Sequence, residues 1–292
     1  MALLAAFEIR DVSGWPEIAQ ESRGKRAKAW VEGPDRLRWL RKECHAARPA
    51  EPAIETSMLR LAAAVGLRVP EGHCAYWTRG GEPVRGVIVR TFIESEAVEF
   101  SEGAEVLGGA DSTYDSDKHE AHTPVRVREA LEREQHPEEL RRELLDILMF
   151  DAWVGNGDRH PGNWGILRAT GQFPRIAPMY DTAACLGTEL QNDHALLNPL
   201  QRGMRIDNYI ERCPSGFGDE KELIGQFELL EELRHWPEWK NRFNFWIKKF
   251  EEIIPHALHY FEGIPNQWLG PERKWLAQEL LQRRLQWLCQ RG

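Results

Sequence analysis

The residues best suited to chemistry lie in the polar stretch Gly157–Asn163 and, further along the chain, at Asp181. Within the stretch, Asp158 is followed five positions later by Asn163. A strong helical pattern ends just before this stretch, so its side chains are expected in a loop. The residues after it predict a short hairpin that leads to Asp181. Two carboxylates and an amide would therefore be presented from loops, where reactive groups commonly lie.

These residue types match the needs of phosphoryl transfer from ATP, which are a group to orient the attacking hydroxyl and oxygen ligands for magnesium. Asp158 is predicted to orient and deprotonate the acceptor hydroxyl. Asn163 and Asp181 are predicted to bind Mg²⁺. His160 is predicted as a second catalytic residue, and with Arg159 it could equally brace the loop or contact phosphate.

A cation for the non-transferred phosphates is expected in the first part of the chain. Lys42 ends a predicted strand, and Glu55 lies on the predicted helix that follows, which is the order of the lysine–glutamate pair of protein kinases. Lys25 and Lys28 are weaker candidates for the same role. A strand lysine is often simply solvated, so the prediction depends on the joint order of strand lysine, helix glutamate, polar loop, hairpin and aspartate.

The two halves of the chain differ in their patterns. Residues 1–95 predict a small strand-rich lobe with ATP-binding strands and one helix. Residues 96–123 predict a mobile acidic linker or loop, because 111–117 are polar and acidic with no apolar period. Residues 124–292 predict a larger, mostly helical lobe that carries the catalytic loop. The predicted fold class is α+β, a two-lobed protein-kinase-like fold.

Individual elements follow from periodicity and from Gly and Pro positions. Strands are predicted at Lys28–Val31, Leu37–Lys42, His73–Thr78, Gly86–Phe92, Trp164–Leu167 and Arg175–Ala177. Helices are predicted at Pro52–Gly66, Pro137–Val154, Glu220–Leu233, Pro237–Phe250 and Pro271–Cys289.

Composition narrows the class of protein. The 292 residues are enough for one large domain or two lobes. The formal net charge of −8 argues against nucleic-acid binding. Residues 23–48 nevertheless hold nine Lys or Arg, which predict either a site for nucleotide phosphate or a solvated basic face. Five cysteines without a C-x-x-C pair indicate neither a disulfide framework nor a zinc ribbon. No membrane span is predicted, and a cytoplasmic location is expected, with secretion without a cleaved signal left open.

Motifs of several other classes are absent from the sequence. It contains no G-x-x-x-x-G-K-[ST], which argues against a P-loop NTPase, and no G-x-G-x-x-G. It also contains no H-R-D-L-x-x-x-N and no D-F-G, so the chain is not an ordinary eukaryotic-type kinase.

Taken together, these residues resemble the HipA-like kinases, bacterial serine/threonine kinases that include the toxins of toxin–antitoxin systems. The resemblance covers about Trp39 to Gly187. Its most specific part is Gly157-Asp158-Arg159-His160-x-x-Asn163 with Tyr180-Asp181. It also includes the strand ending in Lys42, the helix with Glu55, and the helix exit Gly66-Leu67-Arg68-Val69-Pro70.

The resemblance implies ATP and Mg²⁺ as cofactors, with the residue that matches Asp158 as catalytic base and those that match Asn163 and Asp181 as metal ligands. It implies that Lys42 binds ATP and that Ser22 lies in a phosphate-binding, autophosphorylated loop. It also implies a protein acceptor, with aminoacyl-tRNA synthetases or other housekeeping proteins as candidates, and an antitoxin as a candidate partner.

The polar loop does not by itself fix the acceptor. Phosphatidylinositol kinases share Gly-Asp-Arg-His-x-x-Asn, and aminoglycoside and choline phosphotransferases share Asp-x-His-Pro-x-Asn. A lipid or small-molecule kinase is therefore an alternative, and a catalytically silent binding module is another. The sequence is also expected to lack the extra N-terminal subdomain of the longer family members, which implies a shorter member or a lone kinase core.

Overall fold

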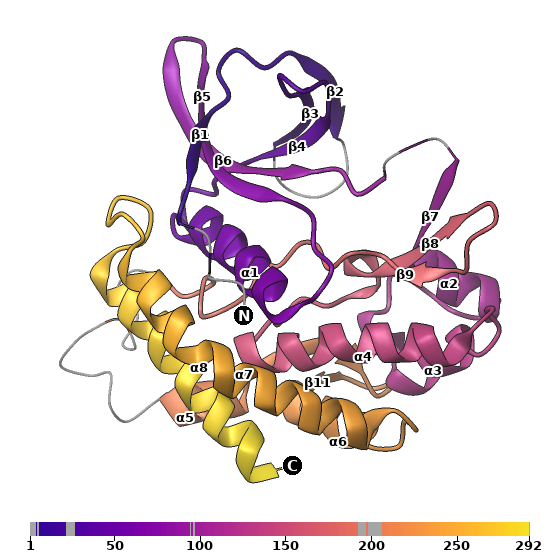
Figure 1. Cartoon of the computed structure of the whole chain (residues 1–292). Helices are drawn as coiled ribbons and strands as arrows, with labels where there is room; N and C mark the ends of the chain where they lie inside the picture. The colour runs from indigo at the N-terminus through magenta and orange to yellow at the C-terminus, as the bar shows by residue number, and fades with distance from the viewer. Residues whose placement is uncertain are drawn as a thin grey trace.

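The computed structural model describes residues 4, 6–21, 27–93, 95, 97–191, 197 and 206–291. Two lobes lie one above the other, a strand-rich lobe from the first part of the chain and a helical lobe from the rest (Figure 1). Helix α1 (Glu51–Val65) lies below the upper sheet, at the boundary between the lobes. The predicted α+β, two-lobed fold is confirmed.

The upper lobe is built on a six-stranded sheet in the order β1-β5-β6-β4-β3-β2. Its strands are β1 (Ile9–Asp11), β2 (Glu17–Glu21), β3 (Lys28–Glu32), β4 (Arg38–Glu43), β5 (Gly72–Arg79) and β6 (Glu82–Arg90). β1 pairs with β5 in parallel, and the other neighbours are antiparallel. The predicted β3–β4 and β5–β6 hairpins are confirmed, and β6 begins earlier than predicted because it pairs along the whole length of β5.

The two faces of this sheet pack against different apolar groups. On one face, Leu59 of α1 packs with Val87 and Val89 of β6. On the other face lies a separate cluster of Val12, Val31, Trp39, Ala75, Trp77 and Ile88. Helix α1 is buried on its other side as well, where it contacts α7 (Trp239–Glu262) of the lower lobe. A charged residue on α1 is therefore enclosed between the two lobes.

Helix α1 has the boundaries that its sequence predicts to within a residue. Pro52 lies in the first turn, and Gly66 ends the helix in the left-handed region at φ 96°. The predicted apolar stripe is buried, at Ile54, Met58, Leu61 and Val65.

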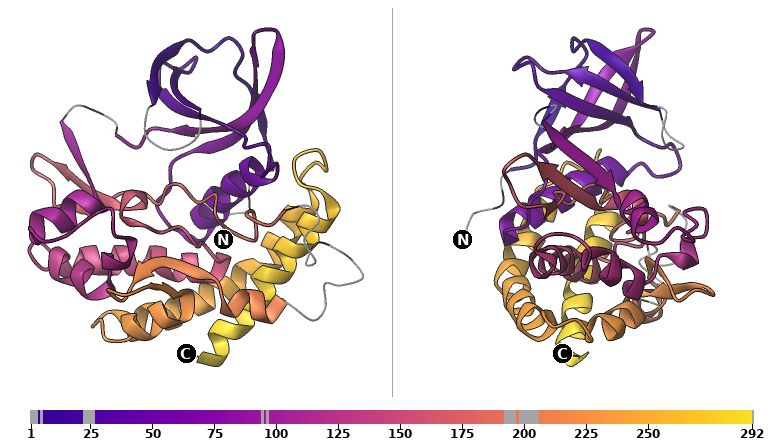
Figure 2. Two further views of the ribbon diagram at one scale, coloured as in Figure 1. Left: turned by 180° about the vertical axis from the view of Figure 1, so that it is seen from behind. Right: turned by 90° about the vertical axis from the view of Figure 1, so that its right-hand side faces the viewer.

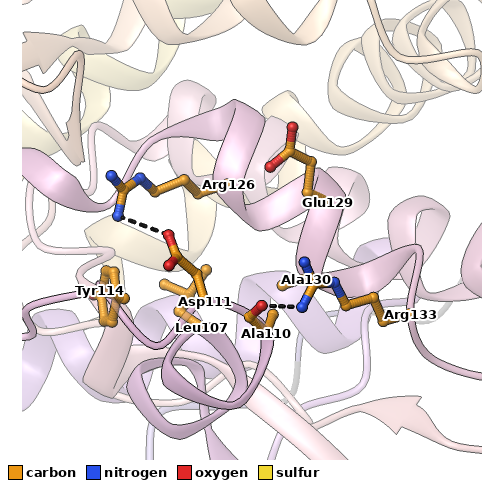
Figure 3. Close-up of a pocket in the computed structure, with 8 residues that line it drawn as sticks. All are labelled: Leu107, Ala110, Asp111, Tyr114, Arg126, Glu129, Ala130 and Arg133. Carbon is orange, nitrogen blue, oxygen red and sulfur yellow. Dashed lines mark hydrogen bonds and ion pairs between the residues drawn. The ribbon is translucent and has the colours of Figure 1, made fainter.

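The segment 96–123, expected as a linker, contains regular structure in its described part: β7 (Val98–Glu102), α2 (Gly103–Ala110) and the 3₁₀ turn η1 (His119–Ala121). Between α2 and η1 the chain has neither helix nor strand, in keeping with its lack of an apolar period. Asp111 there pairs with Arg126 at 3.4 Å beside a cavity of about 20 Å³ (Figure 3), which is room for roughly one water molecule.

The lower lobe surrounds helix α4, which contacts α3, α6, α7 and α8. Its helices are α3 (Pro124–Leu131), α4 (Pro137–Val154), α5 (Ile206–Glu211), α6 (Gln226–Leu233), α7 and α8 (Pro271–Arg291). Its remaining elements are the turn η2 (Pro161–Asn163) and the strands β8 (Gly165–Ala169), β9 (Arg175–Ile176), β10 (Pro214–Gly218) and β11 (Leu223–Gly225). Figure 2 shows α7 and α8 side by side below α1, and the three-stranded sheet β7-β8-β9 at the top of the lower lobe. None of the described helices is long and apolar enough to cross a membrane.

Two helices differ from their predicted ranges. The range Glu220–Leu233 holds the strand β11 before α6 begins, because this part pairs with β10 in a hairpin that the sequence did not reveal. Helix α7 runs beyond the predicted end at Phe250, through Pro255, to Glu262. Proline removes one backbone donor, but the burial of apolar side chains beyond it compensates, at Ile253, Ala257, Tyr260 and Phe261.

Candidate active site

Lys42 lies on β4 directly opposite Val87 of β6, so its side chain is on the face of the sheet that α1 covers. Its Nζ donates to Glu55 Oε1 at 2.7 Å and to Asp181 Oδ1 at 3.1 Å. The Lys42 and Glu55 side chains are 5% and 1% exposed, and that of Asp181 is 32% exposed. One ammonium group therefore joins the sheet, α1 and the loop after β9.

The two carboxylate partners of Lys42 keep its ammonium group charged. Burial alone would lower the pKa of Lys42, but the carboxylates of Asp181 and Glu55 outweigh burial and hold that pKa above its ordinary value of 10.5. Glu55 Oε2 is buried and has no hydrogen-bond partner among the described residues, so the Glu55 carboxylate depends on Lys42 for compensation.

Arg159 connects the polar loop to the rest of the lower lobe. It is fully buried and donates from Nε and Nη2 to the two carboxylate oxygens of Asp151, near the end of α4, at 2.7 and 2.9 Å. Its Nη1 donates to the carbonyl oxygens of Asn163 at 2.5 Å and Tyr180 at 3.0 Å. One guanidinium group thus fixes α4, the loop and the segment that follows β9.

The polar side chains of the loop also hold its backbone. Asn163 Nδ2 donates to the carbonyl oxygen of Asp158 at 2.6 Å, and the Asp158 N–H donates to Asn156 Oδ1 at 3.2 Å. His160 Nδ1 accepts from the Gly162 N–H at 3.0 Å, at the start of η2. This contact of His160 serves the conformation of the loop, and its catalytic role stays a prediction. The Asp158 side chain is exposed, whereas Asn163 is 5% exposed.

Strand β10 packs against the loop backbone to backbone. Gly216 has φ 78°, and a Cβ there would lie 2.6 Å from the backbone N of Arg159. His122 Nδ1 donates to the Gly216 carbonyl oxygen at 2.9 Å, and Trp164 Nε1 donates to His122 Nε2 at 3.1 Å. The sequence did not predict the β10–β11 hairpin, and its strand β10 supports the loop by packing against the backbone of Arg159.

The predicted β8–β9 hairpin is present and leads to Asp181. Asp181 has φ 51°, a left-handed conformation that Asp adopts more readily than most residues. The preceding Tyr180 donates from its hydroxyl to the Gly162 carbonyl oxygen at 2.8 Å, and its ring lies 5.3 Å from that of Phe92. Asp181 is thus fixed by its neighbour on one side and by Lys42 on the other.

The structure brings the predicted site residues into two groups, Lys42–Glu55–Asp181 and Asp158–Asn163. Arg159 links the two groups through the carbonyl oxygens of Asn163 and Tyr180. Lys25 and Ser22 lie outside the described residues. Asp151 was missed by the sequence reasoning, although an aspartate inside the apolar run 147–154 is a signal, because a buried carboxylate needs a partner. Nothing in the sequence points to Gly216.

The polar groups at this site fit a nucleotide-bound magnesium ion. Within the described part of the chain, no group of three or more His, Cys, Asp or Glu is arranged to hold a metal ion. A Mg²⁺ ion bound to a nucleotide needs only one or two protein ligands, since phosphate oxygens and water complete its coordination shell. The amide oxygen of Asn163 and the carboxylate of Asp181 are suitable ligands.

Comparisons with known proteins agree with this geometry. The HipA-like C-terminal domain family matches residues 21–261. A segment of 98 residues is 43% identical to the serine/threonine-protein kinase CtkA of Helicobacter pylori, over 32% of this chain and only 30% of that protein. The crystal structure of a Helicobacter pylori proinflammatory kinase CtkA matches with a TM-score of 0.75 at 16% identity, over 97% of this chain and 98% of that one.

A chain from the Shewanella oneidensis complex of the toxin–antitoxin proteins HipA and HipB with operator DNA matches with a TM-score of 0.60 at 13% identity, over 96% of this chain and 67% of that one. The two lobes and the site between them therefore define a protein of the kinase-like fold. The chain belongs to the HipA-like C-terminal domain family, because that family matches most of its length. The family resemblance stated from the polar loop is confirmed.

Proposed function

We propose that this protein is a serine/threonine protein kinase that uses ATP and Mg²⁺ and transfers the γ-phosphoryl group to a hydroxyl of a protein. The observation that supports this best is the double contact of Lys42 Nζ with Glu55 and Asp181, at 2.7 and 3.1 Å. A strand lysine paired with a helix glutamate, next to a metal-binding aspartate, is how protein kinases hold nucleotide phosphates. Membership of the HipA-like family agrees with it.

In this proposal Lys42 provides the positive charge for the non-transferred phosphates. Nucleotide phosphate replaces Asp181 at Nζ, while Glu55 keeps the ammonium group in place. Asn163 and Asp181 hold Mg²⁺, which when bound neutralises charge on the phosphates. Since Lys42 is only 5% exposed, its attraction for phosphate is stronger than that of a surface lysine.

Asp158 orients the acceptor hydroxyl and takes its proton. Its backbone is held on both sides by Asn156 and Asn163, at 3.2 and 2.6 Å, so the carboxylate projects from a fixed loop. Its exposure favours an acceptor carried by a large molecule, because a small-molecule kinase is expected to enclose its acceptor. An aminoacyl-tRNA synthetase or another housekeeping protein is the first acceptor to test, and an antitoxin the first partner.

The test incubates purified wild-type protein and Asp158→Ala with radiolabelled ATP and Mg²⁺, alone and with a cell extract. The wild type is expected to label itself or another protein, and Asp158→Ala to lose the transfer. Calorimetry is expected to show that both bind Mg·ATP, since Lys42, Asn163 and Asp181 are intact. Mass spectrometry of cells that express each form then identifies the phosphorylated proteins.

Each alternative predicts a different result. Transfer that survives Asp158→Ala would remove the role given to this residue. Label that enters only lipid or a small molecule would favour the second kind of kinase. A wild type that fails to bind Mg·ATP would favour a silent binding module.

A further inference from the structure

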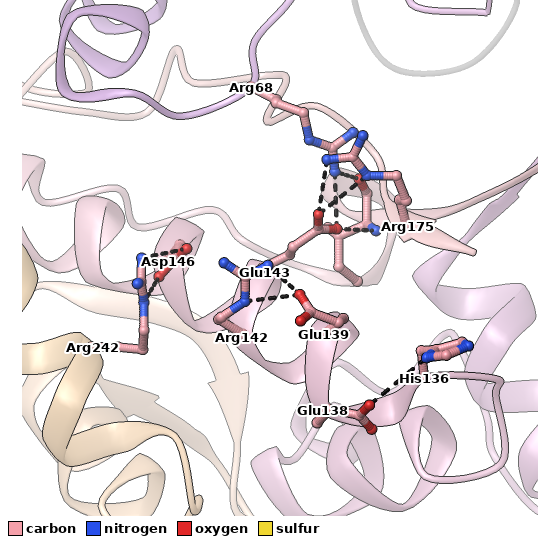
Figure 4. A network of polar contacts seen from close by, with 10 residues as sticks. Arg68, His136, Glu138, Glu139, Arg142, Glu143, Asp146, Arg175 and Arg242 are labelled. Carbon is pink, nitrogen blue, oxygen red and sulfur yellow. Dashed lines mark hydrogen bonds and ion pairs between the residues drawn. The ribbon is translucent and has the colours of Figure 1, made fainter. Parts of the chain in front are cut away.

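Glu143, in the middle of α4, accepts hydrogen bonds from residues of two other segments of the chain (Figure 4). Its Oε2 accepts from Arg68 Nη2 at 2.9 Å and from the Ile176 N–H at 2.8 Å. Its Oε1 accepts from Arg175 Nε and Nη2 at 3.3 and 3.2 Å. The Glu143 side chain is 15% exposed, whereas those of Arg68 and Arg175 are 36% and 55% exposed, so the contacts are shielded from water on the Glu143 side only.

Arg68 contacts both ends of the short segment that leads towards Asp181. Besides Glu143, its Nη2 donates to the carbonyl oxygen of Ile176 at 2.5 Å. Its own carbonyl oxygen accepts from the N–H of Met179 at 2.8 Å. Asp181 follows two residues after Met179, so Arg68 fixes the backbone from which Asp181 extends.

Arg68 is also tied to the helix that carries Glu55. Gly66 ends α1, and the Leu67 N–H donates to the Ala62 carbonyl oxygen at 2.9 Å, so the chain at Arg68 is continuous with the last turn of α1. Arg68 is therefore joined both to the end of the helix that carries Glu55 and to the segment that leads to Asp181. The contacts of Arg68 therefore influence the positions of both carboxylates that Lys42 joins, Glu55 and Asp181.

We infer that Arg68 and Glu143 are positioning residues of the phosphotransfer site, which set the metal ligand Asp181 relative to Glu55 on α1. They act through the backbone of residues 176–179 and through the end of α1, and in this structure neither contacts Lys42, Asp158 or Asn163 by a hydrogen bond. The inference rests on the proposed function. Groups that hydrogen-bond directly to a metal ligand typically change metal affinity about 10- to 100-fold when they are removed, and groups that act through the backbone beside the ligand are expected at the lower end of that range.

The test measures how much Mg²⁺ is needed for ADP binding in the wild type, Arg68→Met and Arg68→Lys. Arg68→Met is expected to raise the Mg²⁺ concentration at half-maximal ADP binding about tenfold. ADP binding in excess EDTA is expected to be unchanged, because Lys42 and Glu55 are retained. Arg68→Lys is expected to recover part of the Mg²⁺ affinity, since an ammonium group can still reach Glu143.

Arg142→Met is the matched control. Arg142 precedes Glu143 on α4 and pairs with Glu139 on the same helix, with 42% and 53% of the two side chains exposed. That variant loses an ion pair of α4 without touching the segment before Asp181, and its Mg²⁺ requirement is expected to equal that of the wild type.

The outcomes separate this inference from the proposed function. If ADP binding by Arg68→Met depends on Mg²⁺ concentration in the same way as in the wild type and Arg142→Met, this inference is overturned and the proposed function is not. Equal losses of ADP affinity with Mg²⁺ and in EDTA, which indicate general damage, would also overturn this inference. A wild type without Mg²⁺-dependent nucleotide binding would overturn the proposed function itself. Combining Arg68→Met with Glu143→Gln is expected to add little to either single effect, and additive effects would contradict a shared contact.

Discussion

Arg159 donates to both carboxylate oxygens of Asp151, at 2.7 and 2.9 Å, and the two side chains are 0% and 2% exposed. Burial alone would lower the pKa of Arg159, but the Asp151 carboxylate outweighs burial and raises it. Because Arg159 also donates to the carbonyl oxygens of Asn163 and Tyr180, this pair holds the loop that carries Asp158. The stability of the lobe and the geometry of the loop therefore depend on the same pair.

Replacing Asp151 with Asn is expected to lower the free energy of unfolding by about 3–5 kcal/mol, since it leaves the Arg159 guanidinium buried without a counter-charge. Urea unfolding followed by tryptophan fluorescence measures this. Asp158→Asn is the control, because its side chain is exposed, and it is expected to change stability by no more than about 0.5 kcal/mol while abolishing transfer. Equal stability of the two variants would contradict the structural role of Asp151.

Lys42→Met is expected to abolish nucleotide binding and to lower the free energy of unfolding by about 3–5 kcal/mol, because Glu55 is left buried as an unpaired carboxylate. Adding Glu55→Gln is expected to restore part of the stability but none of the binding. Since the pKa of Lys42 is raised above 10.5, the pair contributes its full stability below that pH and loses it only as the pH rises through the folded-state pKa. Calorimetry and urea unfolding are the measurements, and nucleotide binding retained by Lys42→Met would contradict the site.

Gly216→Ala is expected to destabilise the protein and to reduce transfer. Gly216 and Gly171 both have positive φ, 78° and 76°, so alanine costs about 1–2 kcal/mol at either position. An added Cβ at Gly216 would also lie 2.6 Å from the Arg159 backbone, whereas one at Gly171 would lie more than 4 Å from every described residue beyond its chain neighbours. Gly171→Ala is therefore expected to lose only the backbone cost and to retain transfer, and equal effects of the two variants would show that β10 does not support the loop.

His73 on β5 is expected to make stability depend on pH. Its Nδ1 lies 3.3 Å from Glu8 Oε2 and 3.3 Å from Arg60 Nη2, and its Nε2 lies 2.7 Å from Glu71 Oε1. Arg10 is also close enough to affect its pKa. Burial lowers the pKa of His73 below its ordinary value of 6.5, Glu71 partly offsets this, and the two arginines lower it further. The unfolded chain therefore takes up more protons as the pH falls through 6.5, and stability falls with it.

His73→Gln is expected to reduce this pH dependence. The loss of melting temperature between about pH 7.5 and about pH 5.5 should be smaller in the variant than in the wild type, because one group that binds protons mainly in the unfolded state is gone. Thermal unfolding followed by circular dichroism measures both losses. Identical losses would show that His73 binds protons equally in the folded and unfolded states.

Local patterns were sufficient for several elements. Proline at the start and glycine after the end defined α1 and α4, because these residues have backbone preferences that hold in almost any context. The β8–β9 hairpin also followed from its turn and its apolar residues. The end of α7 was missed because Pro255 is an ordinary helix breaker, and only burial of the residues beyond it offsets that effect.

The sequence by itself determined the kinds of groups at this site and their order along the chain: Lys42, Glu55, Asp158, Asn163 and Asp181. Types and order are properties of the covalent chain, and they were enough to identify the family. Only the tertiary structure decided that Lys42 reaches both Glu55 and Asp181, the latter 139 positions away, because that contact depends on how the sheet, α1 and the loop after β9 pack. The supports of the site, Asp151, Gly216 and the Arg68–Glu143 contact, are ordinary residues in sequence, and their roles come from neighbours that folding brings to them.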